Sequence, residues 1–207
     1  WAQRLERLSN MHGKPEMKCE AYGFLSWAYY YNPVGLKNFE YIDKGIDLAD
    51  SIGDIGLKAY FLYIMGYNYF SILDFRQADK SYSHAITLFS QISDTLGLVD
   101  TYRAKASNCT GHRAYTLANQ YLENAMDMAR EIRDTGREAL CLCNLAENSL
   151  FQYCESTDTA YAGLLPKARR MALSALGMAS NDYNIKCKAV CAAIRAMFYE
   201  LMRGGCQ

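Results

Sequence analysis

Three tetrapeptides of one form recur along this chain at a constant distance: SIGD at 51–54, QISD at 91–94 and EIRD at 131–134. Their aspartates therefore follow one another every 40 residues. A fixed period of this length is typical of a repeat array, in which each unit is one supersecondary element that buries its apolar face only by stacking on its neighbours. Such an array favours a function carried by a surface rather than by a catalytic cleft.

Each 40-residue unit contains two helical patterns of about 14 residues separated by a short turn, so the unit is predicted to be a helical hairpin. Small residues are expected where two helix backbones approach closely, and large residues are expected to fill the space beside them. In the clearest copy, the first helix carries Leu62, Met65, Gly66 and Tyr69, and the second carries Ala78, Tyr82 and Ala85.

This pattern of leucine, methionine-glycine, tyrosine, alanine and an aromatic residue resembles the tetratricopeptide repeat. The 40-residue spacing resembles the longer-repeat branch of that family, which includes Pins-like scaffolds, kinesin light chains, bacterial Rap-type peptide sensors and the sensory arms of bacterial activators and cyclases. The resemblance implies an all-α fold, a right-handed superhelical solenoid of antiparallel helix hairpins. It also implies that the chain binds a protein or a peptide.

The repeats are predicted to form a single domain over residues 1–207, and the chain is expected to be a fragment of a longer protein. In the fourth repeat the second helix arrives late, which indicates an insertion, and Pro166 fits the first position of that helix. The expected parts are a half-repeat at 1–13, repeats at about 14–53, 54–93, 94–133 and 134–182 with an insertion near 154–163, and a terminal helix at about 183–203.

Charge and composition restrict the classes of partner. Lysine plus arginine and aspartate plus glutamate both number 22, so no net field draws the chain to nucleic acid or to an anionic membrane. No apolar run approaches the roughly 18 residues expected of a spanning helix. We therefore expect a cytoplasmic protein whose partner is a protein or peptide, without direct nucleic-acid or membrane contact, and with homo-oligomerisation left open.

The eight cysteines do not have the spacing of a structural zinc site. Cys187 and Cys191 lie four residues apart on one helical face and could form half of a metal site. We interpret the cysteines as reduced packing residues, since free cysteine packs like a small hydrophobic side chain. The chain contains no nucleophile elbow, phosphate-binding glycine loop or His-Glu-x-x-His motif. It is therefore predicted not to be an enzyme and to need no metal and no cofactor.

The aromatic content points to a candidate binding surface, since 17 tyrosines are present against 8 phenylalanines. In the resembled family, set positions of the first helices line a concave groove, and aromatic side chains with polar tips suit a wet groove that grips apolar groups. The alternatives are that single rings belong to the core, and that the array serves self-association through its end helices. The groove candidates are Trp27, Tyr30, Tyr60, Tyr63, Tyr67 and Phe70, with a more polar end at Arg103, Ser107, Asn144, Glu147 and Phe151.

Overall fold

The computed structural model describes residues 14–31, 37–156, 161, 163–179 and 182–204. Within these ranges there are α-helices and no β-strands. The helices are α2 (Pro15–Tyr31), α3 (Lys37–Ile52), α4 (Ile55–Ser71), α5 (Phe75–Gln91), α6 (Thr95–Gly111), α7 (Tyr115–Glu131), α8 (Thr135–Glu155), α9 (Leu164–Met178) and α10 (Tyr183–Gly204).

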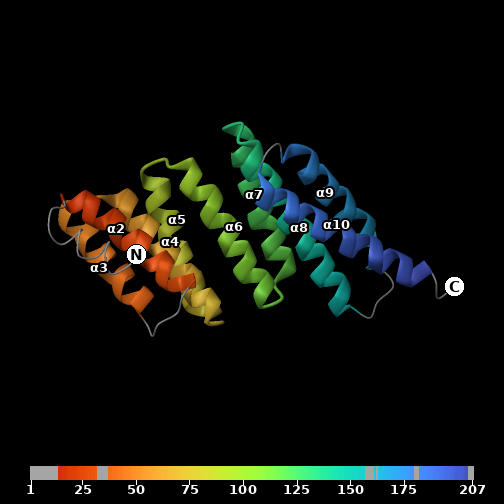
Figure 1. The fold of residues 1–207 in the computed structure, drawn as a ribbon, viewed down its shortest axis with the longest axis horizontal. Helices are drawn as coiled ribbons and strands as arrows, with labels where there is room; N and C mark the ends of the chain where they lie inside the picture. The colour runs from red at the N-terminus through yellow and green to blue at the C-terminus, as the bar shows by residue number, and fades with distance from the viewer. Residues whose placement is uncertain (1–13, 32–36, 157–160, 162, 180–181, 205–207) are drawn as a thin grey trace. The chain divides into compact units, whose positions relative to one another are not determined.

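The chain divides into two compact units, Trp1–Thr101 and Tyr102–Gln207. In the first unit α2 packs against α3, α3 against α4 and α4 against α5; in the second, α7 packs against α8, α8 against α9 and α9 against α10 (Figure 1). The prediction of an all-α repeat fold built from helix hairpins is confirmed. The predicted half-repeat at 1–13 lies outside the described residues. Helix α9 begins at Leu164, so Pro166 is its third residue rather than its first, a position whose backbone N–H has no intrahelical acceptor.

The turns between helices repeat every 20 residues, half the period seen in the tetrapeptides. In the turns from α4 to α8, the last helix residue is followed by one further residue, one residue with positive φ, and one residue that precedes the next helix. In the turn from α3 to α4, the positive-φ residue Gly53 follows the last helix residue directly. At the second turn, Leu73 N–H donates to Phe70 O (3.0 Å) and Asp74 N–H donates to Tyr69 O (2.9 Å), the two bonds of a Schellman motif. The positive-φ residues are Gly53, Leu73, Ser93, Arg113 and Arg133.

The residue that completes each Schellman motif also caps the following helix. Asp54, Asp74, Asp94 and Asp134 each accept a hydrogen bond from the backbone N–H three residues later, at 2.9 to 3.1 Å. Such caps stabilise a helix by about 1 kcal/mol. Ala114 occupies the same place before α7 and makes no side-chain cap. One residue thus ends one helix and begins the next.

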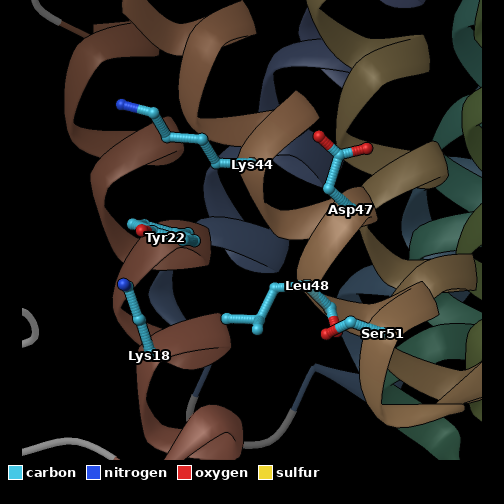
Figure 2. Close-up of a pocket in the computed structure, with 6 residues that line it drawn as sticks. All are labelled: Lys18, Tyr22, Lys44, Asp47, Leu48 and Ser51. Atoms are coloured by element: carbon cyan, nitrogen blue, oxygen red, sulfur yellow. The ribbon is translucent and has the colours of Figure 1, made fainter.

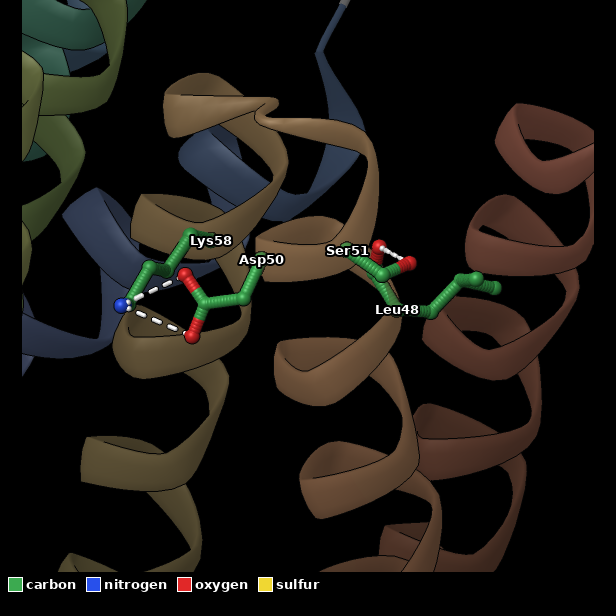
Figure 3. A network of polar contacts seen from close by, with 4 residues as sticks. All are labelled: Leu48, Asp50, Ser51 and Lys58. Atoms are coloured by element: carbon green, nitrogen blue, oxygen red, sulfur yellow. Dashed lines mark hydrogen bonds and ion pairs between the residues drawn. The ribbon is translucent and has the colours of Figure 1, made fainter.

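An ion pair spans the turn from α3 to α4. The Lys58 ammonium lies 2.7 and 2.9 Å from the two carboxylate oxygens of Asp50 (Figure 3). Eighty residues later, Arg130 and Glu138 make the same cross-turn contact with the charges exchanged, at 2.6 Å. Because these groups are partly exposed, each pair contributes at most about 1 kcal/mol. The exchange preserves the contact but not the sign of either residue.

Close helix approach depends on glycine both inside a hairpin and between neighbouring hairpins. A Cβ atom built on Gly66 of α4 would lie 2.4 Å from a ring carbon of Tyr82 on α5, and one built on Gly45 of α3 would lie 2.2 Å from the ring of Phe61 on α4. Real Cβ atoms do not reach such distances, so only glycine fits while the rings stay in place. Tyr82 and Phe61 are fully buried and fill these positions.

Three buried asparagines follow the 40-residue period, Asn68, Asn108 and Asn148, each on a first helix of a hairpin. The amide of Asn148 donates to Tyr115 O (3.0 Å) and to Asn119 Oδ1 (2.6 Å) on α7. A buried amide needs such partners, because an unsatisfied one costs about 1–3 kcal/mol. Asn68 likewise joins α4 to the preceding α3 through the side chain of Asn38. The Asn68 and Asn148 amides thus each join a first helix to the helix before it, within one unit.

Candidate functional site

Aromatic side chains from α2, α4 and α5 gather on one side of the first unit. Six of them are partly or largely exposed, and the seventh, Tyr82, is buried beneath. We refer to this group as the aromatic cluster. Its members are Trp27, Tyr30, Tyr31, Tyr60, Tyr63, Tyr67 and Tyr82.

Ring contacts connect the cluster from α2 to α5. The Trp27 ring lies 5.6 Å from the ring of Tyr67, edge to face, and Tyr67 lies 5.1 Å from Tyr63 and 6.1 Å from Tyr82 between ring centroids. The indole N–H of Trp27 donates to the Tyr60 hydroxyl at 3.0 Å. Contacts of this kind are worth about 0.5–1.5 kcal/mol each beyond area burial. The rings are therefore held in place before any partner arrives.

The helix backbones make room for this arrangement. Gly23 of α2 faces the Tyr60 ring, and a Cβ built there would lie 3.2 Å from that ring. Gly66 lets Tyr82 lie under Tyr63 and Tyr67. Glycine at both places thus lets the rings of Tyr60 and Tyr82 approach the backbone of a neighbouring helix closely.

The exposures within the cluster are graded. Tyr31 is 77% exposed and Tyr60 is 37% exposed, whereas Tyr82 is 1% exposed. Burial raises the pKa of Tyr30, and the nearby hydroxyls of Tyr31 and Tyr67 raise it further. The pKa of Tyr82 is also raised, chiefly by burial. The cluster contains no Asp, Glu, Lys, Arg or His, so it offers an aromatic surface with hydroxyl and indole groups that can form hydrogen bonds.

Phe70 lies apart from these ring contacts in the direction of the next helix, with its ring 6.0 Å from that of Phe75 on α5. The sequence predicts one surface that contains Trp27, Tyr30, Tyr60, Tyr63 and Tyr67. The structure brings these five side chains together. Tyr82 was assigned to packing alone, yet it forms the floor of the cluster. The pairing of Gly66 with Tyr82 in the repeat pattern could have indicated this place, because a glycine that faces a large ring indicates that the ring packs directly against the helix backbone.

The predicted polar residues all belong to the second unit. Ser107 on α6 donates to the Arg103 carbonyl at 3.2 Å, and Glu147 on α8 pairs with Arg195 of α10 at 3.1 Å. Burial raises the pKa of the Cys143 thiol to about 11, Glu147 raises it too, and nearby Lys188 and Arg103 lower it. Charges of both signs therefore surround Cys143. Asn144 is half-buried and Phe151 is exposed on the same helix.

A single channel with an aromatic floor and a polar end remains a prediction, since the aromatic and polar residues belong to different units.

A cleft of about 350 Å³ opens between α2 and α3. Lys18 and Tyr22 enter it from α2, and the remaining lining residues come from α3 (Figure 2). The Lys18 ammonium lies 5.8 Å from the Tyr22 ring centroid, a cation–π contact. The α3 lining consists of Lys44, Asp47, Leu48 and Ser51. This mixture of both charges with one leucine gives no common chemistry that selects a ligand.

The other classes of site were checked on the described residues. The seven cysteines within them form no disulfide bond with one another, and no three potential metal-binding side chains come together there. Cys187 is half-buried and Cys191 is exposed on α10. None of the described helices has the length and apolarity needed to cross a bilayer.

No known family profile matches the chain, and no curated protein matches it in sequence. Among solved structures, the chain is similar to BtubC (BKLC) from P. vanneervenii, with a TM-score of 0.64 and 13% sequence identity. The superposition covers 99% of this chain and 88% of that one. At this identity the likeness shows the fold alone, a helical repeat consistent with the tetratricopeptide type.

Proposed function

We propose that this chain is a non-enzymatic protein-binding module and that its aromatic cluster holds a short segment of a partner protein. The proposal rests on six partly exposed rings from two successive first helices, packed in a connected layer. Isolated surface aromatics need no explanation, but a contiguous exposed aromatic patch marks an interaction site. Tryptophan and tyrosine are also the side chains that most often dominate binding energy at interfaces.

The cluster suits a segment that presents apolar side chains and is not strongly charged. It contains no Asp, Glu, Lys, Arg or His, and its tyrosine hydroxyls and the Trp27 indole N–H, which donates to Tyr60, supply polar groups. Because the rings already contact one another, little side-chain entropy is lost when a partner binds. Such a surface can therefore hold a short peptide with useful affinity.

In the wider setting, we propose that the module is the sensory or regulatory domain of a larger cytoplasmic signalling or transcription-regulating protein. Its partner would then be a peptide or an output domain of the same polypeptide. It would act without a metal, a cofactor or direct contact with nucleic acid or membrane. Helical-repeat architecture supports a scaffold for protein binding, and the aromatic cluster supplies the contact surface.

The test uses the chain's own fluorescence. The sequence contains two tryptophans, Trp1 and Trp27, so a Trp1→Phe background leaves Trp27 as a single reporter inside the cluster. Peptides selected from a random displayed library against this variant should shift the Trp27 emission on titration. Replacement of the two most exposed cluster tyrosines, Tyr31→Ala with Tyr60→Ala, should weaken binding at least tenfold while helicity stays unchanged.

The matched control is Tyr153→Ala with Tyr199→Ala, a half-buried tyrosine pair in ring contact at 5.9 Å between α8 and α10. This pair lies in the other unit and should leave peptide affinity unchanged. The proposal fails if selected peptides bind without changing Trp27 emission, or if the control pair weakens binding as much as the cluster pair does.

A further inference from the structure

Helix α10 is apolar on two opposite faces. One face, made of Ile185, Ala189, Ala192 and Ala196, is buried against α8 and α9. A helix that is apolar all round is normally buried all round. The other face carries an uncharged stripe at steps of three and four residues. We call it the α10 stripe; it consists of Tyr183, Cys187, Val190, Cys191, Ile194, Met197, Phe198, Leu201 and Met202.

The repeat register identifies what this face does in earlier hairpins. Asp182 caps α10 by accepting from Ile185 N–H at 3.1 Å, as Asp134 caps α8 by accepting from Arg137 N–H at 2.9 Å. The position twelve residues after the cap is where the first helix of a hairpin contacts the second helix of the same hairpin. It is held by Gly66, Ala106 and Ala146 in the earlier hairpins, and by Ile194 in α10.

The isoleucine changes which occupant fits. At Gly66 even a methyl group would lie 2.4 Å from Tyr82 of the covering helix. Ile194 is 59% exposed and projects further than a methyl group. A covering helix must therefore lie further away than the second helix of an ordinary hairpin does. Helices that pack through large apolar side chains lie toward the wide end of the about 8–10 Å range of distances between helix axes.

We propose that the α10 stripe pairs with the same stripe of a second copy of this chain, antiparallel and centred on Ile194. The stripe is nearly symmetric about that residue: Val190 and Phe198 lie four residues to either side, and Cys187 and Leu201 lie seven to either side. An antiparallel copy brings each pair to the same height with apolar groups on both sides. A two-fold contact needs such self-complementarity.

The stripe offers a continuous apolar surface for a dimer contact. Seven of its large side chains are 38 to 77% exposed. No charged side chain interrupts it. The stripe and the aromatic cluster share no residue and belong to different units.

Sedimentation velocity of the 207-residue chain between 1 and 100 µM tests this proposal. The wild type should form a dimer, and Ile194→Glu with Leu201→Glu should raise its dissociation constant at least 100-fold. Both positions are exposed, so helicity should be unchanged. The matched control replaces two exposed leucines elsewhere in the same unit, Leu117→Glu with Leu173→Glu, and should leave the dimer intact.

The antiparallel register has a test of its own. In a Leu201→Cys variant, a short bismaleimide should join the introduced thiol to Cys187 of the second copy, a link identified by mass spectrometry of the digested dimer. A monomer at 100 µM, open polymers instead of a closed dimer, a dimer that survives the paired glutamates, or cross-links that join like positions in the two copies would each overturn the proposal.

Discussion

Replacing Gly66 with alanine places a methyl group where the ring of Tyr82 already lies. The added Cβ would be 2.4, 2.6 and 2.9 Å from three ring carbons, whereas carbon atoms in contact normally stand about 3.5–4.0 Å apart. The ring must move by about 1 Å or more. It is 1% exposed and packs against Tyr63 and Tyr67, so it can move only by displacing the aromatic cluster.

Two opposing terms set the magnitude. Overpacking a close contact costs about 1–3 kcal/mol. Alanine in a helix interior is favoured over glycine by about 1 kcal/mol. Gly66→Ala should therefore lower the free energy of unfolding by up to about 2 kcal/mol. Gly177 of α9 supplies the matched control, because a Cβ there would meet no atom within 4 Å. Gly177→Ala should stabilise the chain by about 0.5–1 kcal/mol.

Urea unfolding followed by circular dichroism measures both variants. The difference between them removes the helix preference and leaves the steric cost of about 1–3 kcal/mol. In the Trp1→Phe background, Gly66→Ala should also shift the emission of Trp27, since its ring contacts Tyr67. If both alanine variants stabilise the chain equally, α4 and α5 do not approach as closely as described, and the argument for a layered cluster is refuted.

Four further outcomes follow from the turns and the buried amides. Ala114→Asp should add the missing cap and stabilise the chain by about 1 kcal/mol in urea unfolding. Arg133→Gly should stabilise by about 0.5–1 kcal/mol because φ there is 58°, and Gly53→Ala should destabilise similarly because φ there is 70°. A destabilising Arg133→Gly together with a stabilising Gly53→Ala would contradict the turn geometry. Asn148→Ala should cost about 2–4 kcal/mol by leaving its partners unpaired, and a neutral result would show that the amide is not a stacking contact. Burial raises the pKa of the Asp134 carboxyl, but hydrogen bonds from the following helix lower it, and the net shift is downward. The ionised carboxylate therefore stabilises the fold above about pH 4, and this stabilisation is lost as the pH falls further. Between pH 7 and pH 3 the Asp134→Asn variant should lose less stability than the wild type does.

The fold can be predicted from the sequence because the residues that recur with the period are the ones that the turns between helices require. The motif Ile-x-Asp occurs at 52–54, 92–94 and 132–134, and these aspartates cap helices. The same motif at 72–74 was overlooked, although it reveals the 20-residue step between single helices. The turn ending at Ala114 hides this shorter period, because neither the isoleucine nor the aspartate is present there.

The candidate site could be predicted only in part. Helical spacing places Trp27, Tyr60, Tyr63 and Tyr67 on one side, but the direction of each ring depends on side-chain torsions and on neighbouring helices. For this reason Phe70 turns toward the next helix, which spacing alone does not indicate. The burial of the three asparagines was not predicted either, because asparagine is usually a surface residue. Their recurrence every 40 residues therefore gave no reason to place them in the core.

Two nested periods also govern how this chain can change length. The capped turns recur every 20 residues, whereas the buried asparagines and the small residues at close helix contacts recur every 40. Removing 20 residues would preserve every turn yet exchange the roles of first and second helices from that point onward. A chain built in this way can therefore be shortened or extended coherently only by whole hairpins, each of which brings its own amide and its own small residue.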